Sequence, residues 1–172
     1  MKIYRGKIRP ISEEIVKTLT TEGDIEVAPE QTEEVILDVE AIIKEYLRLE
    51  EELNRQAREL LQIRGMSYTE FGRVKRELAE EKKIEIGDRA LHWIANQIIE
   101  CFMINNRVSE IFSEDWVLRK KIIKVFNANL GLEEQIDKEV RARIKNITEG
   151  TPEWEIEYQK IFNQLAKKRG LL

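Results

Sequence analysis

Few residues in this sequence have side chains that could carry out catalysis or bind a metal ion. The sequence contains one histidine, His92, and one cysteine, Cys101, whereas a structural zinc site needs about four cysteine, histidine or carboxylate ligands. A carboxylate-bridged di-iron bundle needs Glu-x-x-His pairs, but Arg89 stands three residues before His92. The sequence also has no glycine-rich phosphate-binding loop and no Gly-x-Ser-x-Gly motif. We therefore expect no bound metal, no cofactor and no catalytic site.

Basic side chains are the other candidates for chemistry, because clusters of them can neutralise phosphate groups. The candidate nucleic-acid-binding residues are Arg141, Arg143, Lys145, Lys167, Lys168 and Arg169. The chain has 29 Lys plus Arg against 33 Asp plus Glu and a net charge of -4, whereas nucleic-acid-binding domains are usually basic. We therefore interpret most basic residues as partners of glutamates on the same helices. Association with nucleic acid is kept as the alternative function.

The elements that must position these side chains are helices. Eight glycines and three prolines among 172 residues are too few for a turn-rich β fold. Ser12 predicts the start of a first helix that ends near Gly23. Pro29 suits the first turn of a second helix, and no helix breaker follows until Gly65. The sequence therefore predicts an all-α bundle with a long helix over about residues 29–63.

The second half of the sequence repeats the plan of the first half. A shift of 83 residues superposes the apolar positions of the two halves, for example Val39 on Ile122. We interpret this match as an internal duplication, which gives two homologous three-helix units over residues 1–87 and 88–172. Gly131 interrupts the second long helix, and glycine costs about 1 kcal/mol relative to alanine in a helix. We expect that helix to be broken near residue 131.

Two short segments fall outside this helical pattern. Residues 24–27 and 108–111 occupy equivalent places after the first helix of each unit, and the first segment alternates polar and apolar residues. This alternation is typical of a strand. The two segments predict a minor two-stranded ribbon.

The second half of the long helix carries an apolar stripe as narrow as the seam of a coiled coil. The stripe lies between glutamates and arginines, so we expect this part of the helix to project or to pair with another chain. Trp154, at the start of the last helix, either packs in the core or, if it is exposed, adds a docking surface. The candidate partner-binding residues are Leu49, Leu53, Ala57, Leu60 and Trp154.

The sequence resembles a bacterial family, the domain-of-unknown-function family five hundred and seven, in its longer, duplicated form. The resemblance rests on MKIYRGKI at the start of the chain, EGDIEV at residues 22–27 and EVRARIKNITEGTPEWEIEY at residues 139–158. Further matching segments are residues 38–65, 87–91, 114–115 and 118–121. The likeness spans nearly the whole chain, but the family has no established activity, cofactor or site, so it implies no functional residue.

These observations together favour a non-catalytic protein–protein interaction or assembly module. The partner would be another protein or a second copy of the chain, and an enzyme with His92 as its base is the least favoured alternative. The single Cys101 cannot form an internal disulfide. No apolar run approaches the ~18 residues of a membrane span. We therefore expect a cytoplasmic protein that does not enter a membrane.

Overall fold

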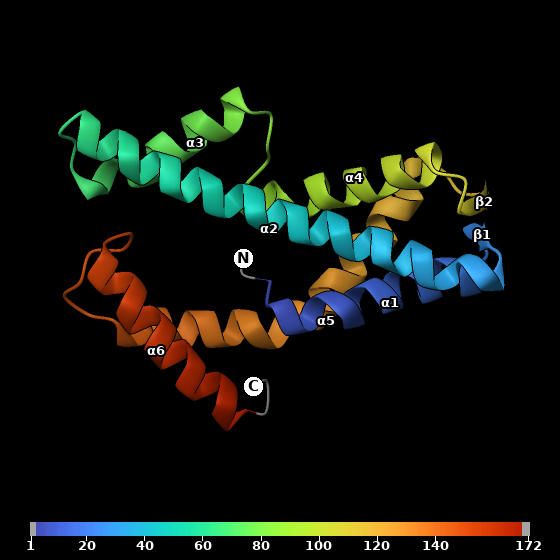
Figure 1. The fold of residues 1–172 in the computed structure, drawn as a ribbon. Coiled ribbons are helices and arrows are strands. Elements are labelled where there is room, and N and C mark those ends of the chain that lie inside the picture. The colour runs from blue at the N-terminus through green and yellow to red at the C-terminus, as the bar shows by residue number, and fades with distance from the viewer. Residues whose placement is uncertain (1–2, 170–172) are drawn as a thin grey trace. The chain divides into compact units, whose positions relative to one another are not determined.

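The computed structural model describes residues 3–169 and is dominated by helices (Figure 1). The described helices are α1 (Arg5–Thr21), α2 (Thr32–Ile63), α3 (Phe71–Glu81), α4 (Ala90–Ile104), α5 (Asp115–Arg143) and α6 (Pro152–Lys168). The described strands are β1 (Ile25–Val27) and β2 (Val108–Ile111). Of the described residues, 78% are helical, which confirms the prediction of an all-α fold.

Local signals place the long helix where the sequence predicts it. Pro29 opens a short 3-10 turn, Pro29–Gln31, which leads directly into α2. Proline suits this position because the first turn of a helix has no internal partner for a backbone N–H. Helix α2 then continues to Ile63, and the chain turns at Gly65 with a positive φ of 61°. Helix α2 therefore ends where the sequence predicts, and it begins three residues later than the predicted start at about residue 29.

Helix α1 begins earlier than the sequence predicts. It starts at Arg5, so Ser12 is not a cap but a buried residue inside the helix. The Ser12 hydroxyl donates a hydrogen bond to the backbone carbonyl of Ile8 at 2.8 Å. This bond satisfies the buried hydroxyl one turn back along the helix, as serine can do in helix interiors. The predicted start at Ser12 is therefore wrong.

Helix α5 is continuous through Gly131, so the break predicted near that residue is absent from the structure. Leu130, Ile136 and Val140 on this part of the helix are all buried. Their burial favours the helix by more than the roughly 1 kcal/mol that one glycine costs. Packing of the apolar face therefore outweighs the local propensity of Gly131.

The chain divides into two compact units that differ from the predicted halves. Unit 1 contains residues 3–50 and 84–129, and unit 2 contains residues 51–83 with the described part of 130–172. Each unit therefore takes one segment from each predicted repeat. The order helix, strand, long helix, helix occurs twice along the chain, whereas the duplication itself stays a prediction.

Unit 1 is an arrangement of α1, α4 and the first parts of α2 and α5. An ion pair between Arg9 and Glu33 links α1 to α2 at 2.8 Å. The hydroxyl of Tyr46 on α2 donates to the backbone carbonyl of Glu85 before α4, and its ring lies 5.5 Å from that of Trp93. The core is formed by fully buried aliphatic side chains from all four helices, including Ile15, Ile43, Ile94 and Ile122.

The two strands form an antiparallel ribbon within unit 1. Ile25 is paired with Ile111, and Val27 with Val108, with a register shift between Glu26 and Val27. Figure 1 shows this ribbon just beyond the C-terminal end of α4. The predicted pairing of residues 24–27 with 108–111 is confirmed.

Unit 2 contains two helix pairs. The second part of α2 packs on α3 through the buried residues Ala57, Leu61 and Val74. The second part of α5 contacts α6, where the hydroxyl of Tyr158 donates to a carboxylate oxygen of Asp137 at 2.5 Å.

None of the described helices is long and apolar enough to cross a membrane.

Candidate functional site

The apolar stripe predicted to bind a partner is largely covered by the chain itself. Leu53 is 1% exposed and Ala57 is fully buried. Leu60 is half-buried and packs against the cluster that Ala57 forms with Val74 of α3. Leu49 is half-buried as well. The prediction that this stripe is open for another chain is wrong, because the short helix α3 covers part of the seam that the sequence left without a partner.

Trp154 is also part of the interior of unit 2. Its side chain is only 7% exposed, and its ring stacks on that of Tyr158 with 4.9 Å between the ring centroids. The guanidinium of Arg141 lies 5.3 Å from the centroid of the Trp154 ring. Of the two alternatives for Trp154, the structure agrees with core packing, and the indole is not exposed for docking.

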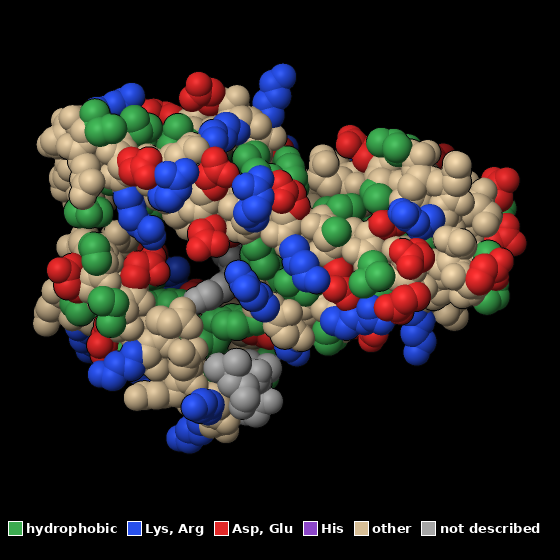
Figure 2. Space-filling view, in the orientation of Figure 1, with side chains coloured by type: hydrophobic (Ala, Val, Ile, Leu, Met, Phe, Trp, Pro, Cys, Tyr) green, Lys and Arg blue, Asp and Glu red, His purple; other side chains and the backbone are tan. Residues whose placement is uncertain are grey.

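The basic residues proposed to contact nucleic acid are partly neutralised. Arg141 forms ion pairs with Asp137 and Glu149, and Glu139 pairs with both Arg143 and Arg169. Figure 2 shows basic and acidic side chains interspersed over the visible face. The remaining three residues, Lys145, Lys167 and Lys168, are exposed. The arginines that anchor both basic clusters thus serve as structural ion-pair partners.

His92 and Cys101, the residues considered for catalysis or metal binding, both lie on α4. His92 is exposed, whereas Cys101 is half-buried and its sulfur accepts a hydrogen bond from Asn105. Burial raises the pKa of the Cys101 thiol, and the nearby Asp38 carboxylate adds to this rise. In the described part of the chain, no three His, Cys, Asp or Glu side chains are grouped as metal ligands.

A groove in unit 1 combines an exposed aromatic side chain with charged side chains. It has a volume of about 560 Å³, which is within the range typical of ligand-binding pockets. Both of its walls are helical, since its lining comes from α1 with the residue that follows it and from the first part of α5. The lining residues are Glu14, Thr18 and Glu22 on one wall, and Trp116, Val117, Lys120, Lys121, Lys124, Val125 and Ala128 on the other. We call this feature the α1/α5 groove.

Helix α5 presents its groove residues because of its periodicity. Trp116, Lys120 and Lys124 follow one another at a spacing of four residues, which places them along one face at intervals of about 6 Å. Leu118 and Ile122 face the other way and are fully buried. The same helix therefore anchors its apolar face in the core and lines the groove with an aromatic ring and two ammonium groups.

Lys121 fixes the position of α5 beside the ribbon. Its ammonium group lies 2.6 Å from a carboxylate oxygen of Asp24 and 2.7 Å from one of Glu22. Hydrogen bonds to these carboxylates raise the pKa of Lys121. Asp24 is buried and also accepts a hydrogen bond from the Ser113 hydroxyl at 2.6 Å. The charge of Lys121 is therefore used within the protein.

Lys120 and Lys124 are different from Lys121. Both side chains are exposed, and neither has an ion-pair partner among residues 3–169. Trp116, one turn before Lys120, is 59% exposed, and its indole N–H donates to a carboxylate oxygen of Glu114 at 2.8 Å. The groove thus combines an exposed, oriented indole with two cationic groups that have no internal partner.

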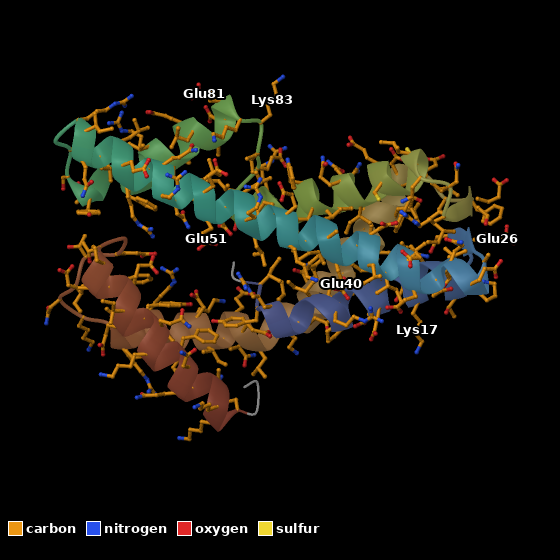
Figure 3. All side chains as sticks on the ribbon, in the orientation of Figure 1. Lys17, Glu26, Glu40, Glu51, Glu81 and Lys83 are labelled. Carbon is orange, nitrogen blue, oxygen red and sulfur yellow. The ribbon has the colours of Figure 1, made fainter. Side chains whose placement is uncertain are left out.

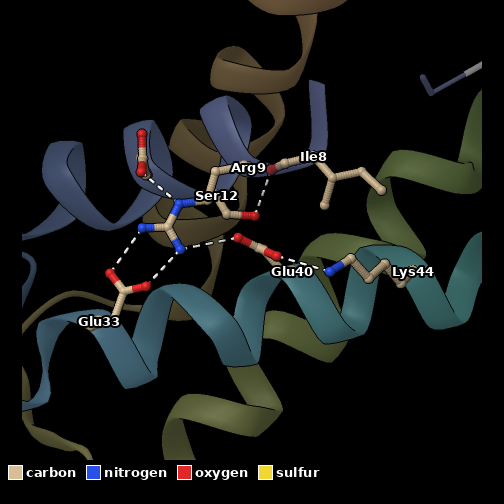
Figure 4. A network of polar contacts seen from close by, with 7 residues as sticks. Ile8, Arg9, Ser12, Glu33, Glu40 and Lys44 are labelled. Carbon is tan, nitrogen blue, oxygen red and sulfur yellow. Dashed lines mark hydrogen bonds and ion pairs between the residues drawn. The ribbon is translucent and has the colours of Figure 1, made fainter. Parts of the chain in front are cut away.

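The opposite wall is held in place by an ionic network between α1 and α2 (Figure 4). Arg9 contacts Glu13 at 2.6 Å, Glu33 at 2.8 Å and Glu40 at 3.2 Å. Glu40 also pairs with Lys44 at 2.9 Å. The hydrogen bond from Arg9 lowers the pKa of Glu33, and the bond from Lys44 followed by that from Arg9 lowers the pKa of Glu40 against the effect of burial. The network orients α1 and so supports the acidic wall of the groove.

The acidic wall gives the groove two different electrostatic sides. Glu14 lines it and accepts a hydrogen bond from Asn129 at 2.7 Å. Farther along α1, Lys17 extends away from the helix into open space (Figure 3). Because one wall carries carboxylates and the other carries ammonium groups, the groove is suited to a ligand with charges of both signs. This arrangement is suited to binding.

This groove was not predicted from the sequence, although one signal for it was present. The four-residue spacing of Trp116, Lys120 and Lys124 can be read directly from the sequence. The sequence does not show that α5 lies beside α1, because the two helices are far apart in the chain. A single amphipathic helix does not indicate which neighbour lines its polar edge.

The comparisons with known proteins agree with the resemblance seen in the sequence. No curated protein matches the chain. The family described as "Protein of unknown function (DUF507)" matches residues 1–171, which is essentially the whole chain, and the protein therefore belongs to this family.

Proposed function

We propose that this protein is a non-catalytic interaction module and that its α1/α5 groove docks another protein. The observation that carries the proposal is the exposed Trp116 beside Lys120 and Lys124, which have no ion-pair partners among residues 3–169. Tryptophan is one of the residues that often dominate the binding energy of protein interfaces, and the lysines add charge complementarity. The stripe around Leu53 and Ala57, which the sequence favoured, is replaced as the docking surface because it is buried.

The charges around the groove favour a protein over a nucleic acid as the partner. Glu14 and Glu22 line one wall, and Glu114 contacts Trp116 itself. These carboxylates would repel the continuous negative charge of a phosphate backbone. A polypeptide can instead place single carboxylates against the lysines and other residues against the glutamates. The proposal therefore commits to a protein partner.

The proposed module acts in the cytoplasm, and we propose that it arose by internal duplication. A half-buried Cys101 without a possible internal disulfide partner supports a reducing compartment. The repeated element order supports the duplication. The groove uses α1 from the first predicted repeat and α5 from the second, so each repeat contributes one wall.

The test is an affinity capture from native lysate with three forms of the protein as bait. The first is the unaltered protein, and the second is Lys120→Glu with Lys124→Glu. The third is Lys167→Glu with Lys168→Glu, which makes the same charge change on exposed lysines of α6. Each capture is divided into nuclease-treated and untreated halves.

We expect the unaltered protein to capture specific proteins that remain bound after nuclease treatment. The groove variant should lose these proteins, and the α6 variant should retain them. Proteins retained equally by all three baits would show that the groove is not the docking site. Material that disappears with nuclease, together with loss of binding by the α6 variant, would replace the proposal with the nucleic-acid alternative. A change in solution mass of the free groove variant would identify a second copy of the chain as the occupant.

A further inference from the structure

We infer that the occupant of the α1/α5 groove is an amphipathic helix that carries two acidic side chains one turn apart and an apolar anchor one turn farther along. This inference rests on the proposed function and specifies the partner's chemistry. Its basis is the order of the groove residues along α5, where Trp116 is followed by Lys120 and then by Lys124. Successive members of this row are separated by one helical turn, or about 6 Å.

The lysines define which charges the occupant presents to α5. Lys120 and Lys124 are exposed and have no acidic partner among residues 3–169, whereas the neighbouring Lys121 is paired with Asp24 and Glu22. Two carboxylates one turn apart on a parallel or antiparallel helix match this spacing. An aliphatic or aromatic side chain one turn farther along meets the exposed ring of Trp116. The row is therefore complementary to a helix with one apolar and two acidic positions.

The other wall restricts the far edge of the occupant. Glu14 and Glu22 line the α1 side of the groove, so acidic side chains are unfavourable there. The matching helix carries its carboxylates on the edge that meets α5 and neutral or basic residues on the edge that meets α1. This asymmetry distinguishes the occupant from a uniformly acidic segment.

The secondary structure of the occupant follows from the walls of the groove. Both walls are helices, α1 and α5, whose backbone N–H and C=O groups are paired internally away from the helix ends. An extended segment would find no strand edge to satisfy its backbone. A helix satisfies its own backbone and binds through side chains alone, as in recognition of a helix in a groove.

The experiment uses two helical peptides of identical composition. In the first, a central leucine has two glutamates on its N-terminal side and two on its C-terminal side, all at four-residue spacing. In either chain direction, the leucine can then meet Trp116 while two glutamates meet Lys120 and Lys124. In the second, the glutamates are shifted by two residues onto another face. Both lack tryptophan, and circular dichroism establishes that they are equally helical. Binding is measured by anisotropy of the labelled peptides and by protection of protein tryptophans from acrylamide.

Trp116 gives this measurement its specificity, because Trp93 is half-buried and Trp154 is buried. Acrylamide quenching therefore reports mainly on the ring in the groove. The comparison of the unaltered protein with Trp116→Phe isolates that component. We expect the matched peptide to bind roughly fivefold more tightly than the shifted one, from two exposed ion pairs, and to protect Trp116.

Charge reversal supplies the decisive control. Lys120→Glu with Lys124→Glu should abolish the preference for the matched peptide, and a peptide with lysines in place of the glutamates should restore binding to that variant. The α6 variant Lys167→Glu with Lys168→Glu should behave as the unaltered protein. Equal binding of the two glutamate peptides, or binding of neither, would overturn the inference.

The same set of measurements separates this inference from the proposed function. If the native capture depends on Lys120 and Lys124 while both peptides bind equally or not at all, the groove is a docking site but its occupant is not the helix described. If the capture does not depend on these lysines, the proposed function fails first. Displacement of the matched peptide by a single-stranded oligonucleotide at low concentration would show a general anion site and would also overturn the inference.

Discussion

Asp24 is the buried carboxylate that joins the ribbon to α5. It is 3% exposed, and it binds the ammonium of Lys121 and the hydroxyl of Ser113, both at 2.6 Å. Its backbone carbonyl also accepts a hydrogen bond from the N–H of Phe112 at 2.9 Å. Because a buried charge is stable only when its partners are in place, Asp24 and Lys121 are expected to be energetically coupled.

The first prediction concerns Asp24→Asn. The substitution removes the charge that pairs with Lys121 but leaves Glu22 beside that lysine, so we expect a loss of about 1–3 kcal/mol in the free energy of unfolding. Urea denaturation followed by circular dichroism measures this change. Ser113→Ala removes only the hydroxyl bond and should cost less. A loss below the experimental error for Asp24→Asn would show that the buried pair adds nothing to stability.

The pH dependence of Asp24 gives a second readout. Burial alone would raise the pKa of Asp24, but hydrogen bonds from Lys121 and Ser113 outweigh burial and hold it below its ordinary value. The folded pKa therefore lies below the unfolded value of about 3.9. The stability from this group is present above that pH and is lost as pH falls through the folded pKa. Asp24→Asn should flatten the decline in unfolding free energy below about pH 4, and an unchanged slope would contradict this assignment.

The second mutational prediction concerns Leu53, which lies 1% exposed on α2. Leu53→Asp places a carboxylate in the interior, and we expect a loss of more than about 3 kcal/mol in unfolding free energy. Leu53→Ala should cost roughly 2–5 kcal/mol. Thermal and urea unfolding measure both losses. A stable Leu53→Asp variant with an altered solution mass would instead reinstate Leu53 as an interface residue.

In helix α5, the low helix propensity of Gly131 is opposed by packing of the apolar face. Gly131 lies inside this helix, and a Cβ atom added there meets no atom within 4 Å. Gly131→Ala is therefore expected to raise the unfolding free energy by about 0.5–1 kcal/mol. The shift of the urea midpoint at constant slope measures this gain. Gly150→Ala is the control, because Gly150 has a φ of 90°. Alanine is strained at this φ, so the substitution should lower the unfolding free energy. Destabilisation by Gly131→Ala would show that a bend at this glycine is needed.

The helices and their order were predictable from the sequence because their signals are local. Pro29 and Gly65 bracket α2, and Thr151 caps α6 by accepting a hydrogen bond from the N–H of Trp154 at 3.3 Å. The start of α1 was not predictable from Ser12, since serine fits both a cap and a helix interior where its hydroxyl bonds to the previous turn.

The covering of each helix face was not predictable from the sequence. The spacing of Leu53, Ala57 and Leu60 gives the width of an apolar stripe but not the identity of what packs on it. In the structure α3 covers part of that stripe. The α1/α5 groove escaped detection for the same reason, since it depends on the tertiary neighbour of Trp116 and Lys120. Sequence periodicity therefore indicates which face of a helix is buried. Only the tertiary structure shows which element covers that face.

Each compact unit of the protein contains segments from both halves of the chain. The groove lies entirely within unit 1, with walls from the first and second predicted repeats. A docking site built in this way needs both halves of the chain to fold together. The proposed interaction is thus a property of the assembled fold and not of one repeat.

Photo-crosslinking in the native cell shows whether the α1/α5 groove contacts a protein partner. Trp116→p-benzoylphenylalanine places the reactive group in the groove, and the same substitution at Ile156, which is 70% exposed on α6, is the control. We predict a discrete crosslinked protein from position 116 that is absent from position 156. That product should disappear when Lys120→Glu and Lys124→Glu are added. Identical crosslinked products at both positions, or a product only at Ile156, would contradict the account.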